Sequence, residues 1–276
     1  MTAASEQARA LVSAADHELA AELAERSGEL LLALRQSGAR DPDALRQQGD
    51  RRSHELLVTE LAARRPADAV LSEEGADGSS RLDARRVWIV DPLDGTREFG
   101  EPERVDWAVH VALVIDGFPV AGAVALPALG EVWSTAAPPP QAPAAIVPRP
   151  PAATPPRLAV SRTRPGWSAG LVGRALSAEL VPLGSAGFKA LAVVRGRADI
   201  YAHSSGQYEW DSAAPVAVAL AHGLHASRLD GSPLAYNNAS PYLPDLLIAH
   251  PDWARPALNA VAGGDPSAGA CPTPGT

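Results

Sequence analysis

Residues 88–99 carry the side chains of this chain that are best suited to chemistry. They read Trp-Ile-Val-Asp-Pro-Leu-Asp-Gly-Thr-Arg-Glu-Phe, so Asp91 and Asp94 lie three positions apart. The apolar run predicts a short strand over 87–90 that delivers Asp91 to its end, where Pro92 turns the chain. Two carboxylates this close repel each other strongly unless a cation lies between them. Hard oxygen ligands of this kind favour Mg²⁺.

Gly95 and Thr96 follow the second aspartate directly. At the start of a short helix their backbone N–H groups would face outward, where an anion such as phosphate binds. A plain turn is the alternative, because Asp-Gly pairs are common in turns. The hydrophobic strand before the Asp-Gly pair and the hydroxyl group after it favour an anion-binding site over a plain turn.

Two further acidic segments accompany this stretch. Glu73 and Glu74 follow an apolar pair and precede Gly75, which places them on a loop. Asp211 follows Trp210 at the start of an apolar segment. Taken alone, the first segment could equally be a pair of solvated surface residues. The second could equally be a simple helix N-cap.

Together the three segments resemble the inositol monophosphatase superfamily of Mg²⁺-dependent, Li⁺-sensitive phosphatases. The family pattern is an acidic pair after a hydrophobic strand, then D-P-[LI]-D-G-T, then W-D at a later helix start, and all three occur here in that order. The resemblance spans roughly residues 16–262. It implies an α+β fold, a layered αβαβα sandwich of the inositol monophosphatase and sugar phosphatase type.

The resemblance also implies roles for individual residues. The first metal ion would be held by Glu73, Asp91 and the backbone carbonyl of Leu93. The second would be held by Asp91, Asp94 and Asp211.

The same resemblance implies the groups around the metal ions. Thr96 would orient the attacking water with help from Asp50, which also supports a third, loosely held ion. Gly95 and Thr96 would donate backbone N–H groups to the phosphate, and Glu74 would lie behind the ligands. One metal would then activate a water and another would stabilise the leaving oxygen.

Residues outside the shared pattern indicate the substrate. Arg97-Glu98-Phe99 replaces the T-N-F that inositol phosphatases usually carry, and Glu209 precedes Trp210. These features resemble the adenosine 3′,5′-bisphosphate nucleotidase branch, especially its actinobacterial members. That branch implies hydrolysis of adenosine 3′,5′-bisphosphate, or of its 5′-phosphosulfate relative, at the 3′-phosphate in sulfate assimilation.

Candidate substrate contacts follow from the same comparison. Ser185, Lys189 and Arg228 are candidates for phosphate and ribose, and Tyr201 or His203 for packing near the base. Lys189 stands out because it is the only lysine of the chain.

Two other functions remain open at this point. An inositol-1-phosphate phosphatase, with fructose 1,6-bisphosphatase activity as a variant, would use the same scaffold. A catalytically silent relative that binds metal or nucleotide would also carry these residues. A substrate panel and a test of Mg²⁺ dependence separate the three.

The bulk composition limits partners and location. The formal net charge of −8 disfavours binding to a nucleic acid polymer. The single cysteine, Cys271, excludes a disulfide within the chain and fits the reducing cytoplasm. The first residues contain no unbroken apolar run, so we expect neither a signal peptide nor a membrane anchor. The oligomeric state stays open, with a homodimer as one option.

Hydrophobic periodicity and turn residues predict the elements that must position these groups. We expect helices over 16–34, 53–64, 167–179, 189–194, 211–223 and 253–261. The first would be capped by Asp16 and stopped by Gly38. We expect strands over 87–90, 107–115, 118–120, 131–135, 158–161, 198–202 and 246–250, with a turn at Asp116-Gly117.

The predicted halves meet at a proline-rich segment. Residues 1–135 would form an α+β half with most metal ligands, 136–157 a loop or linker, and 158–262 an α/β half with the substrate-binding elements. The tail, 263–276, would be disordered.

Overall fold

The computed structural model describes residues 3–37, 41–76, 78–136 and 155–265 of the 276-residue chain. The predicted stop at Gly38, most of the proline-rich segment and most of the tail lie outside these residues. The division into two halves stays a prediction.

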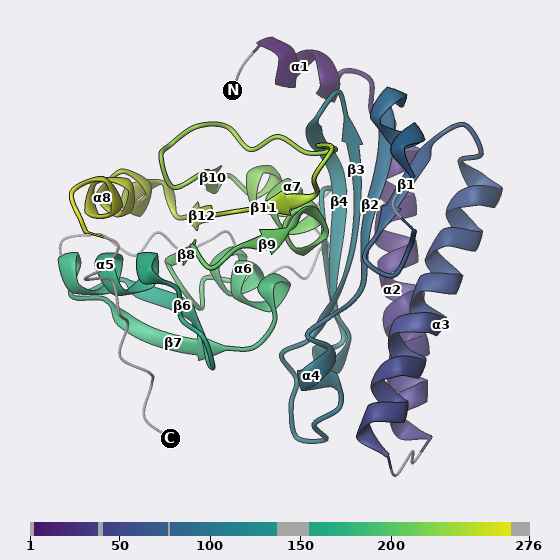
Figure 1. Cartoon of the computed structure of the whole chain (residues 1–276), viewed down its shortest axis with the longest axis horizontal. Helices are drawn as coiled ribbons and strands as arrows, with labels where there is room; N and C mark the ends of the chain where they lie inside the picture. Colours follow the sequence, from purple (N-terminus) through teal and green to yellow (C-terminus); the bar gives the residue numbers. More distant parts are fainter. Residues whose placement is uncertain (1–2, 38–40, 77, 137–154, 266–276) are drawn as a thin grey trace.

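Two five-stranded sheets organise the molecule, with a two-stranded sheet beside them (Figure 1). The first sheet has the order β1-β2-β3-β4-β5, with bounds Ala69–Ser72, Arg86–Asp94, Ala108–Ile115, Phe118–Leu126 and Glu131–Ser134. The second has the order β10-β12-β8-β6-β7, with bounds His225–Ser227, Leu246–Ala249, Ile200–His203, Arg157–Ser161 and Glu179–Leu183. The small sheet pairs β11 (Tyr242–Leu243) with β9 (Gln207–Tyr208).

Helices cover both sheets and fill the space between them. Their bounds are α1 Ala3–Arg9, α2 Ala14–Gln36, α3 Pro42–Arg64, α4 Thr96–Phe99, α5 Trp167–Ala175, α6 Ala186–Val194, α7 Ala213–Ala221 and α8 Pro251–Ala262. Short 3₁₀ turns are η1 Ser79–Asp83, η2 Pro127–Leu129 and η3 Glu209–Asp211. Within the described residues, none of the helices is long and apolar enough to cross a membrane.

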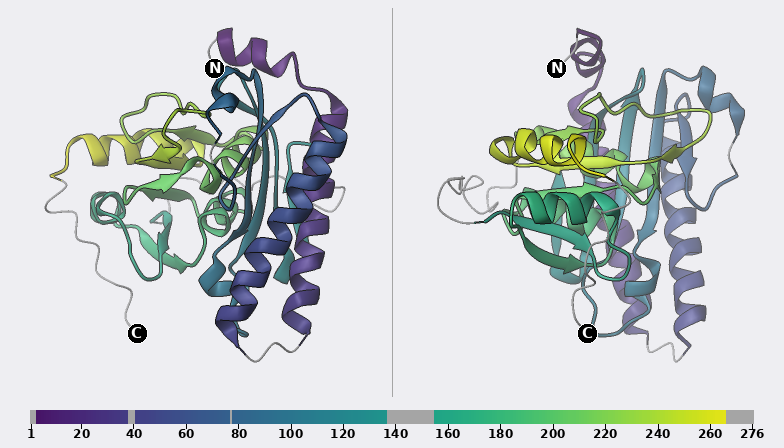
Figure 2. Two further views of the ribbon diagram at one scale, coloured as in Figure 1. Left: turned by 45° about the vertical axis from the view of Figure 1, so that its right-hand side comes forward. Right: turned by 60° about the vertical axis from the view of Figure 1, so that its left-hand side comes forward.

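The elements stack in five layers, α2 and α3, the first sheet, α6 and α7, the second sheet, then α5 and α8 (Figures 1 and 2). Each helix layer contributes to an apolar core against the sheet beside it. The largest buried side chains include Trp88 and Trp107 of the core beneath α2 and α3. The predicted layered αβαβα sandwich is confirmed.

The long helices begin earlier than their apolar periodicity suggests. Helix α2 starts at Ala14 behind an N-cap at Ser13, and Asp16 is its third residue, where it completes a capping box with Ser13. The prediction of Asp16 as the N-cap is therefore wrong, because the N-cap lies about one helical turn earlier, at Ser13. Helix α3 begins at Pro42 rather than near residue 53, because Asp41 caps it and proline suits the first helical position.

The hairpin between β3 and β4 was predicted correctly. Asp116 and Gly117 both have positive φ angles, 51° and 82°, as a two-residue hairpin turn of this type requires. Ile115 pairs with Phe118 across that turn. The hairpin places β3, with His110 on it, in the centre of the first sheet.

Several other predicted boundaries need correction, including those of β4, which runs on to Leu126, and α6, which begins at Ala186. Strand β2 does not end at residue 90 but continues to Asp94. Helix α5 stops at Ala175, because Glu179 already belongs to strand β7. Asp211 lies in η3, and α7 begins two residues later with Ser212 as its N-cap.

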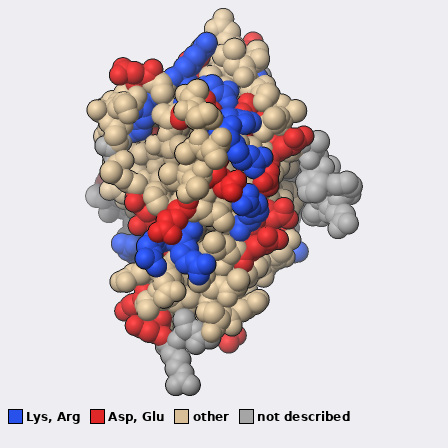
Figure 3. Space-filling view, turned by 90° about the vertical axis from the view of Figure 1, so that its right-hand side faces the viewer, with Lys and Arg blue, Asp and Glu red and all other residues tan. Residues whose placement is uncertain are grey.

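The face formed by α2 and α3 carries acidic and basic side chains in alternation (Figure 3). Arg26 contacts Glu22 and Glu60, and Arg64 contacts Glu22. Exposed pairs of this kind contribute little stability. Because both signs are interspersed, this face offers no positive surface to a nucleic acid polymer.

The buried carboxylate of Asp16 yields a first prediction. Burial acts to raise its pKa, but hydrogen bonds from Ser13, Arg65 and Arg86 lower it from 3.8 to about 2. A pKa depressed in the folded state stabilises the fold above 3.8, and this contribution is lost as the pH falls towards 2. We expect Asp16→Asn to lower the free energy of unfolding by about 2 kcal/mol at neutral pH.

Urea denaturation followed by circular dichroism measures this loss at several pH values. The difference between wild type and variant should shrink as the pH falls below about 4. The control Asp43→Asn, on an exposed residue paired with Arg46, should stay within about 0.5 kcal/mol. A loss that does not depend on pH would show that the shape of the side chain matters rather than its charge.

Candidate metal centre

A β-bulge in β2 brings Asp91 and Asp94 to the same face of the first sheet. Asp91 pairs with His110 and Asp94 with Ala108, so three steps along β2 oppose two along β3. In a regular strand, residues three apart point to opposite faces. The extra residue of the bulge reverses this, and proline is tolerated there because a bulge leaves a backbone group unpaired.

Buried hydroxyl groups hold the bulge from the side of the helices. Ser53 of α3 donates to the carbonyl of Pro92 at 2.6 Å, and the Ser27 and Ser53 hydroxyl oxygens lie 2.5 Å apart. Both serines are fully buried. Inside the bulge, the N–H of Leu93 donates to Asp91 Oδ1 at 3.0 Å. The shape of the D-P-L-D segment is thus fixed by contacts with α2 and α3.

Gly95 ends the bulged strand in a conformation that favours glycine. Its φ and ψ angles are 86° and 43°, in the left-handed region. A Cβ at this position would lie 2.8 Å from Cβ of Ser185. Glycine therefore lets the start of α6 approach the end of β2.

Asp94 lies on the N-terminus of α6. Its two carboxylate oxygens accept hydrogen bonds from the N–H groups of Ala186 at 3.0 Å and Gly187 at 2.6 Å. The positive end of a helix stabilises a carboxylate in this position. Burial acts to raise the pKa of Asp94, but the charge of His110, its hydrogen bond and the charge of Lys189 lower it overall.

His110 is a residue that the sequence analysis missed. Its fully buried ring lies between two elements, with Nε2 3.2 Å from Asp94 Oδ2 and Nδ1 3.0 Å from the carbonyl oxygen of Trp210. A carbonyl only accepts, so Nδ1 donates. Burial acts to lower the pKa of His110, but the charge of Asp94 raises it overall. The available signal was a lone histidine in the otherwise apolar strand 108–115.

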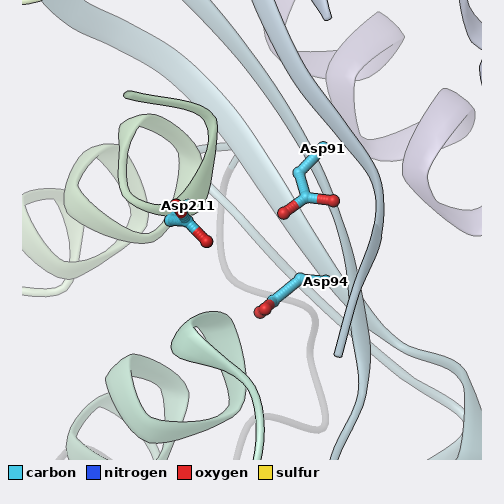
Figure 4. Close-up of side chains that lie close together, drawn as sticks. All are labelled: Asp91, Asp94 and Asp211. Atoms are coloured by element: carbon cyan, nitrogen blue, oxygen red, sulfur yellow. The ribbon is translucent and has the colours of Figure 1, made fainter. Parts of the chain in front are cut away.

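Asp211 completes the cluster from η3. The N–H of Tyr208 donates to Asp211 Oδ2 at 2.6 Å, which turns the carboxylate back towards the first sheet. Among the described residues, oxygens of Asp91, Asp94 and Asp211 all lie within 4.8 Å of one another (Figure 4). Burial and the charge of Asp94 raise the pKa of Asp211 to about 6.

Glu73 directly follows the buried end of β1, is itself exposed, and approaches the cluster from there. Its N–H donates to the carbonyl of Val90 at 3.3 Å, and its carboxyl group is close enough to that of Asp91 for each to affect the pKa of the other. Loss of solvation around that carboxyl group and the charge of Asp211 raise its pKa to about 7. It lies beside the three aspartates rather than within the group defined by the 4.8 Å separation.

Asp50 and Thr96 meet next to the cluster. The Thr96 hydroxyl lies 3.2 Å from Asp50 Oδ1 and 3.1 Å from the carbonyl oxygen of Leu93, so it donates to one of them. Burial and the charge of the exposed Glu74 raise the pKa of Asp50 to about 6. The structure therefore brings this predicted pair together.

The three residues predicted to contact phosphate and ribose lie in different surroundings. Ser185 caps α6, and its hydroxyl accepts from the N–H of Phe188 at 3.1 Å. Lys189 is buried, and its ammonium group donates to the backbone carbonyls of Gly184 and Ser185. Arg228 forms a two-point ion pair with Asp245, at 2.7 and 2.6 Å.

The two predicted base contacts differ in burial. Tyr201 is 2% exposed, and its ring lies 5.5 Å from the Lys189 ammonium. Its face is therefore covered and offers no surface for a base. His203 is half-buried, and its Nε2 donates to the carbonyl of Gly206 at 3.0 Å. The covered Tyr201 ring is therefore a poor candidate for stacking on a base, whereas a role for His203 stays a prediction.

The donor set fits a hard divalent cation. The atoms that the three aspartates bring together are carboxylate oxygens, as Mg²⁺ prefers. The protein offsets the charge of Asp94 with His110 and α6, whereas burial and the charge of Glu73 raise the pKa of Asp91 well above its usual value. A cation would supply the positive charge that Asp91 lacks.

The chain is similar in sequence to known phosphatases. A family model described as the inositol monophosphatase family matches residues 2–258. The chain is 49% identical over 257 residues to a 3′-phosphoadenosine 5′-phosphate phosphatase of Mycobacterium leprae, covering 89% of this chain and 93% of the relative. It is 29% identical over 195 residues to the 3′(2′),5′-bisphosphate nucleotidase CysQ of Escherichia coli K12, covering 69% and 79%.

Solved structures share the fold. CysQ from Bacteroides thetaiotaomicron aligns with a TM-score of 0.72 at 25% identity, over 87% of this chain and 98% of that one. Inositol monophosphatase II from Staphylococcus aureus aligns with a TM-score of 0.74 at 22% identity, over 90% and 95%.

Binding of a divalent cation should be visible without any assay of activity. Neutralising the cluster stabilises the folded chain by about 2.7 kcal/mol at a hundred times the Kd, which raises the melting temperature by roughly 5 °C. We expect Mg²⁺ to raise the melting temperature of the wild type in this way. Asp211→Asn removes one of the repelling charges, so the variant should be at least as stable without metal and should lose the shift.

Differential scanning fluorimetry across a Mg²⁺ titration measures both effects. Glu18→Gln removes the same charge from an exposed position of α2 and should keep the full shift. A full Mg²⁺ shift in Asp211→Asn would show that the cation binds elsewhere.

Proposed function

The chain belongs to the inositol monophosphatase family, and on that premise we propose that it removes the 3′-phosphate of adenosine 3′,5′-bisphosphate. Water attacks phosphorus, the bond from phosphorus to the 3′-oxygen breaks, and AMP and inorganic phosphate leave. The similarity to mycobacterial 3′-phosphoadenosine 5′-phosphate phosphatases over most of both chains carries this choice of substrate. The 5′-phosphosulfate relative is a second candidate substrate.

We place the reaction at the acidic cluster. Asp91, Asp94 and Asp211 would hold the cations, with Glu73 and the Leu93 carbonyl completing the shell of a first ion. The proposed ion is Mg²⁺, in two or three copies, with Li⁺ as an inhibitor. A bound divalent cation supplies Lewis-acid stabilisation of phosphoryl charge and lowers the pKa of a bound water.

The side chains of Thr96 and Asp50 would orient the attacking water. The pKa of Asp50 is raised to about 6, so its carboxylate is mostly ionised at neutral pH and accepts a hydrogen bond from the Thr96 hydroxyl. A threonine oxygen that donates its own hydrogen keeps lone pairs that accept a hydrogen bond from water. The pair would therefore fix the direction of attack.

The phosphate would lie beside Gly95 and Thr96. We assign their backbone N–H groups as donors to its oxygens, since the left-handed Gly95 turns the backbone there. Ser185 contacts this turn and Lys189 adds a buried positive charge behind it. Glu74 acts on the site through its charge, which raises the pKa of both Asp50 and Glu73.

The location and partners follow from this function. A small phosphorylated nucleotide is the partner we propose, and the cytoplasm, where sulfate assimilation takes place, is the proposed compartment. A homodimer remains an open proposal. The acidic net charge of −8 supports a small substrate rather than a nucleic acid polymer.

A substrate panel at saturating Mg²⁺ tests the proposal. We expect kcat/KM for adenosine 3′,5′-bisphosphate to exceed that for inositol 1-phosphate and fructose 1,6-bisphosphate by at least about tenfold, or about 1.4 kcal/mol. Asp94→Asn should lose about a hundredfold or more in kcat, because a charge at the cations is removed. A preference for inositol 1-phosphate would identify an inositol phosphatase instead, and no turnover of any substrate a silent relative.

The role of the Thr96 hydroxyl is tested by a matched pair of variants. Thr96→Val removes the hydroxyl at nearly constant shape and should lower kcat for adenosine 3′,5′-bisphosphate about a hundredfold. Thr96→Ser keeps the hydroxyl and should stay near wild type. Steady-state kinetics at fixed Mg²⁺ measures both, and wild-type turnover by the valine variant would exclude a role in orienting water.

A further inference from the structure

Two exposed tyrosines lie on the small sheet beside the metal centre. Tyr208 and Tyr242 are 46% and 51% exposed, among the most exposed large hydrophobic side chains of the described residues. They are register partners on β9 and β11, so they share one face of that sheet. The Tyr208 ring stacks on Trp210, with centroids 4.8 Å apart and planes 8° apart. Tyr242 meets Tyr208 at 6.0 Å and 80°. These three residues are called the aromatic shelf below.

The shelf is attached to the turn that presents Asp211. The N–H of Tyr208 donates to Asp211 Oδ2 at 2.6 Å, and Trp210 immediately precedes Asp211. The Trp210 carbonyl accepts from His110, which contacts Asp94. Three residues of chain span at most about 10 Å, so the Cα atoms of Tyr208 and Asp211 lie within that distance. A ligand with its phosphate at the carboxylates has its next group within reach of the shelf.

The chemistry of the shelf fits a nucleobase. Its rings are uncharged and planar, and bases stack on tyrosine and tryptophan through their π faces. A stable protein interface needs about 800 Å² on each partner, far more than three side chains supply. The buried Tyr201, which the sequence suggested for the base, has no free face. The shelf is the exposed alternative next to the same site.

We propose that the aromatic shelf binds the adenine base of the substrate by stacking. This inference rests on the proposed function, because it assigns the base-binding part of the same site. The shelf would make binding depend on a base while leaving the phosphoryl chemistry to the carboxylates. Tyr208 acts on Asp211 only through its backbone N–H, so truncating its side chain leaves that hydrogen bond in place.

The test compares ligands with and without a base in Tyr208→Ala and Tyr242→Ala. We expect KM for adenosine 3′,5′-bisphosphate to rise about tenfold in each variant, as the loss of one stacking partner implies. Its kcat and the kinetics of inositol 1-phosphate should stay unchanged. Calorimetry should show AMP binding weakened about as much, and ribose 5-phosphate binding unchanged. Tyr208→Phe and Tyr242→Phe keep the rings and should behave as wild type.

Leu129→Ala provides a control, since Leu129 is an exposed apolar residue on η2. It should leave every constant unchanged. Equal weakening of AMP and ribose 5-phosphate in the tyrosine variants would overturn the proposal. So would a change in oligomeric state by size-exclusion chromatography with nucleotide binding intact. A wild type inactive on adenosine 3′,5′-bisphosphate would overturn the proposed function. The comparison of AMP with ribose 5-phosphate would still decide whether the shelf binds the base.

Discussion

Repulsion between buried carboxylates is the constraint on which the rest of this structure depends. Two unit charges about 4 Å apart cost about 4 kcal/mol at an effective dielectric constant of 20. Here oxygens of three aspartates approach within 4.8 Å, and Asp91 and Asp94 are buried. The protein compensates the two charges unevenly, because His110 and Lys189 lower the pKa of Asp94, whereas burial and the charge of Glu73 raise that of Asp91. That imbalance is the physical reason for proposing divalent cations at the site.

The contacts that stabilise the charge of Asp94 also join the layers of the fold. Asp94 from the first sheet receives the first N–H groups of α6, and His110 from that sheet reaches the carbonyl before Asp211. A Cβ at Gly187 would lie 2.0 Å from Nε2 of His110, so a glycine is needed where α6 meets the sheet. The contacts that assemble the site are therefore also contacts that hold α6 and η3 against the first sheet.

In the proposed function, phosphoryl chemistry and substrate choice use different side chains of one short segment. Within residues 207–211, the carboxylate of Asp211 approaches those of Asp91 and Asp94, whereas the rings of Tyr208 and Trp210 stack on each other beside Tyr242. Lys189 and Tyr201 point into the core and Arg228 is neutralised by Asp245. In the proposed function, positive charge near the phosphate therefore comes from the cations and buried Lys189, and the exposed aromatic rings select the base.

The sequence alone determined the features that rest on neighbouring residues. The hairpin at Asp116-Gly117 follows from residues that accept positive φ, and the succession of helices and strands follows from hydrophobic periodicity. The acidic segments could be recognised because their order in the chain is itself the family pattern, and the layered fold followed from that resemblance.

Tertiary structure decided what depends on residues far apart in the chain. The bulge that turns Asp91 and Asp94 to one face is set by pairing with β3 and by Ser53 of α3. The place of His110, the burial of Tyr201 and the exposure of Tyr208 depend on which layers pack together. Local preference cannot report these contacts, because burial and hydrogen bonding between distant segments exist only once the sheets and helices have closed around the carboxylates.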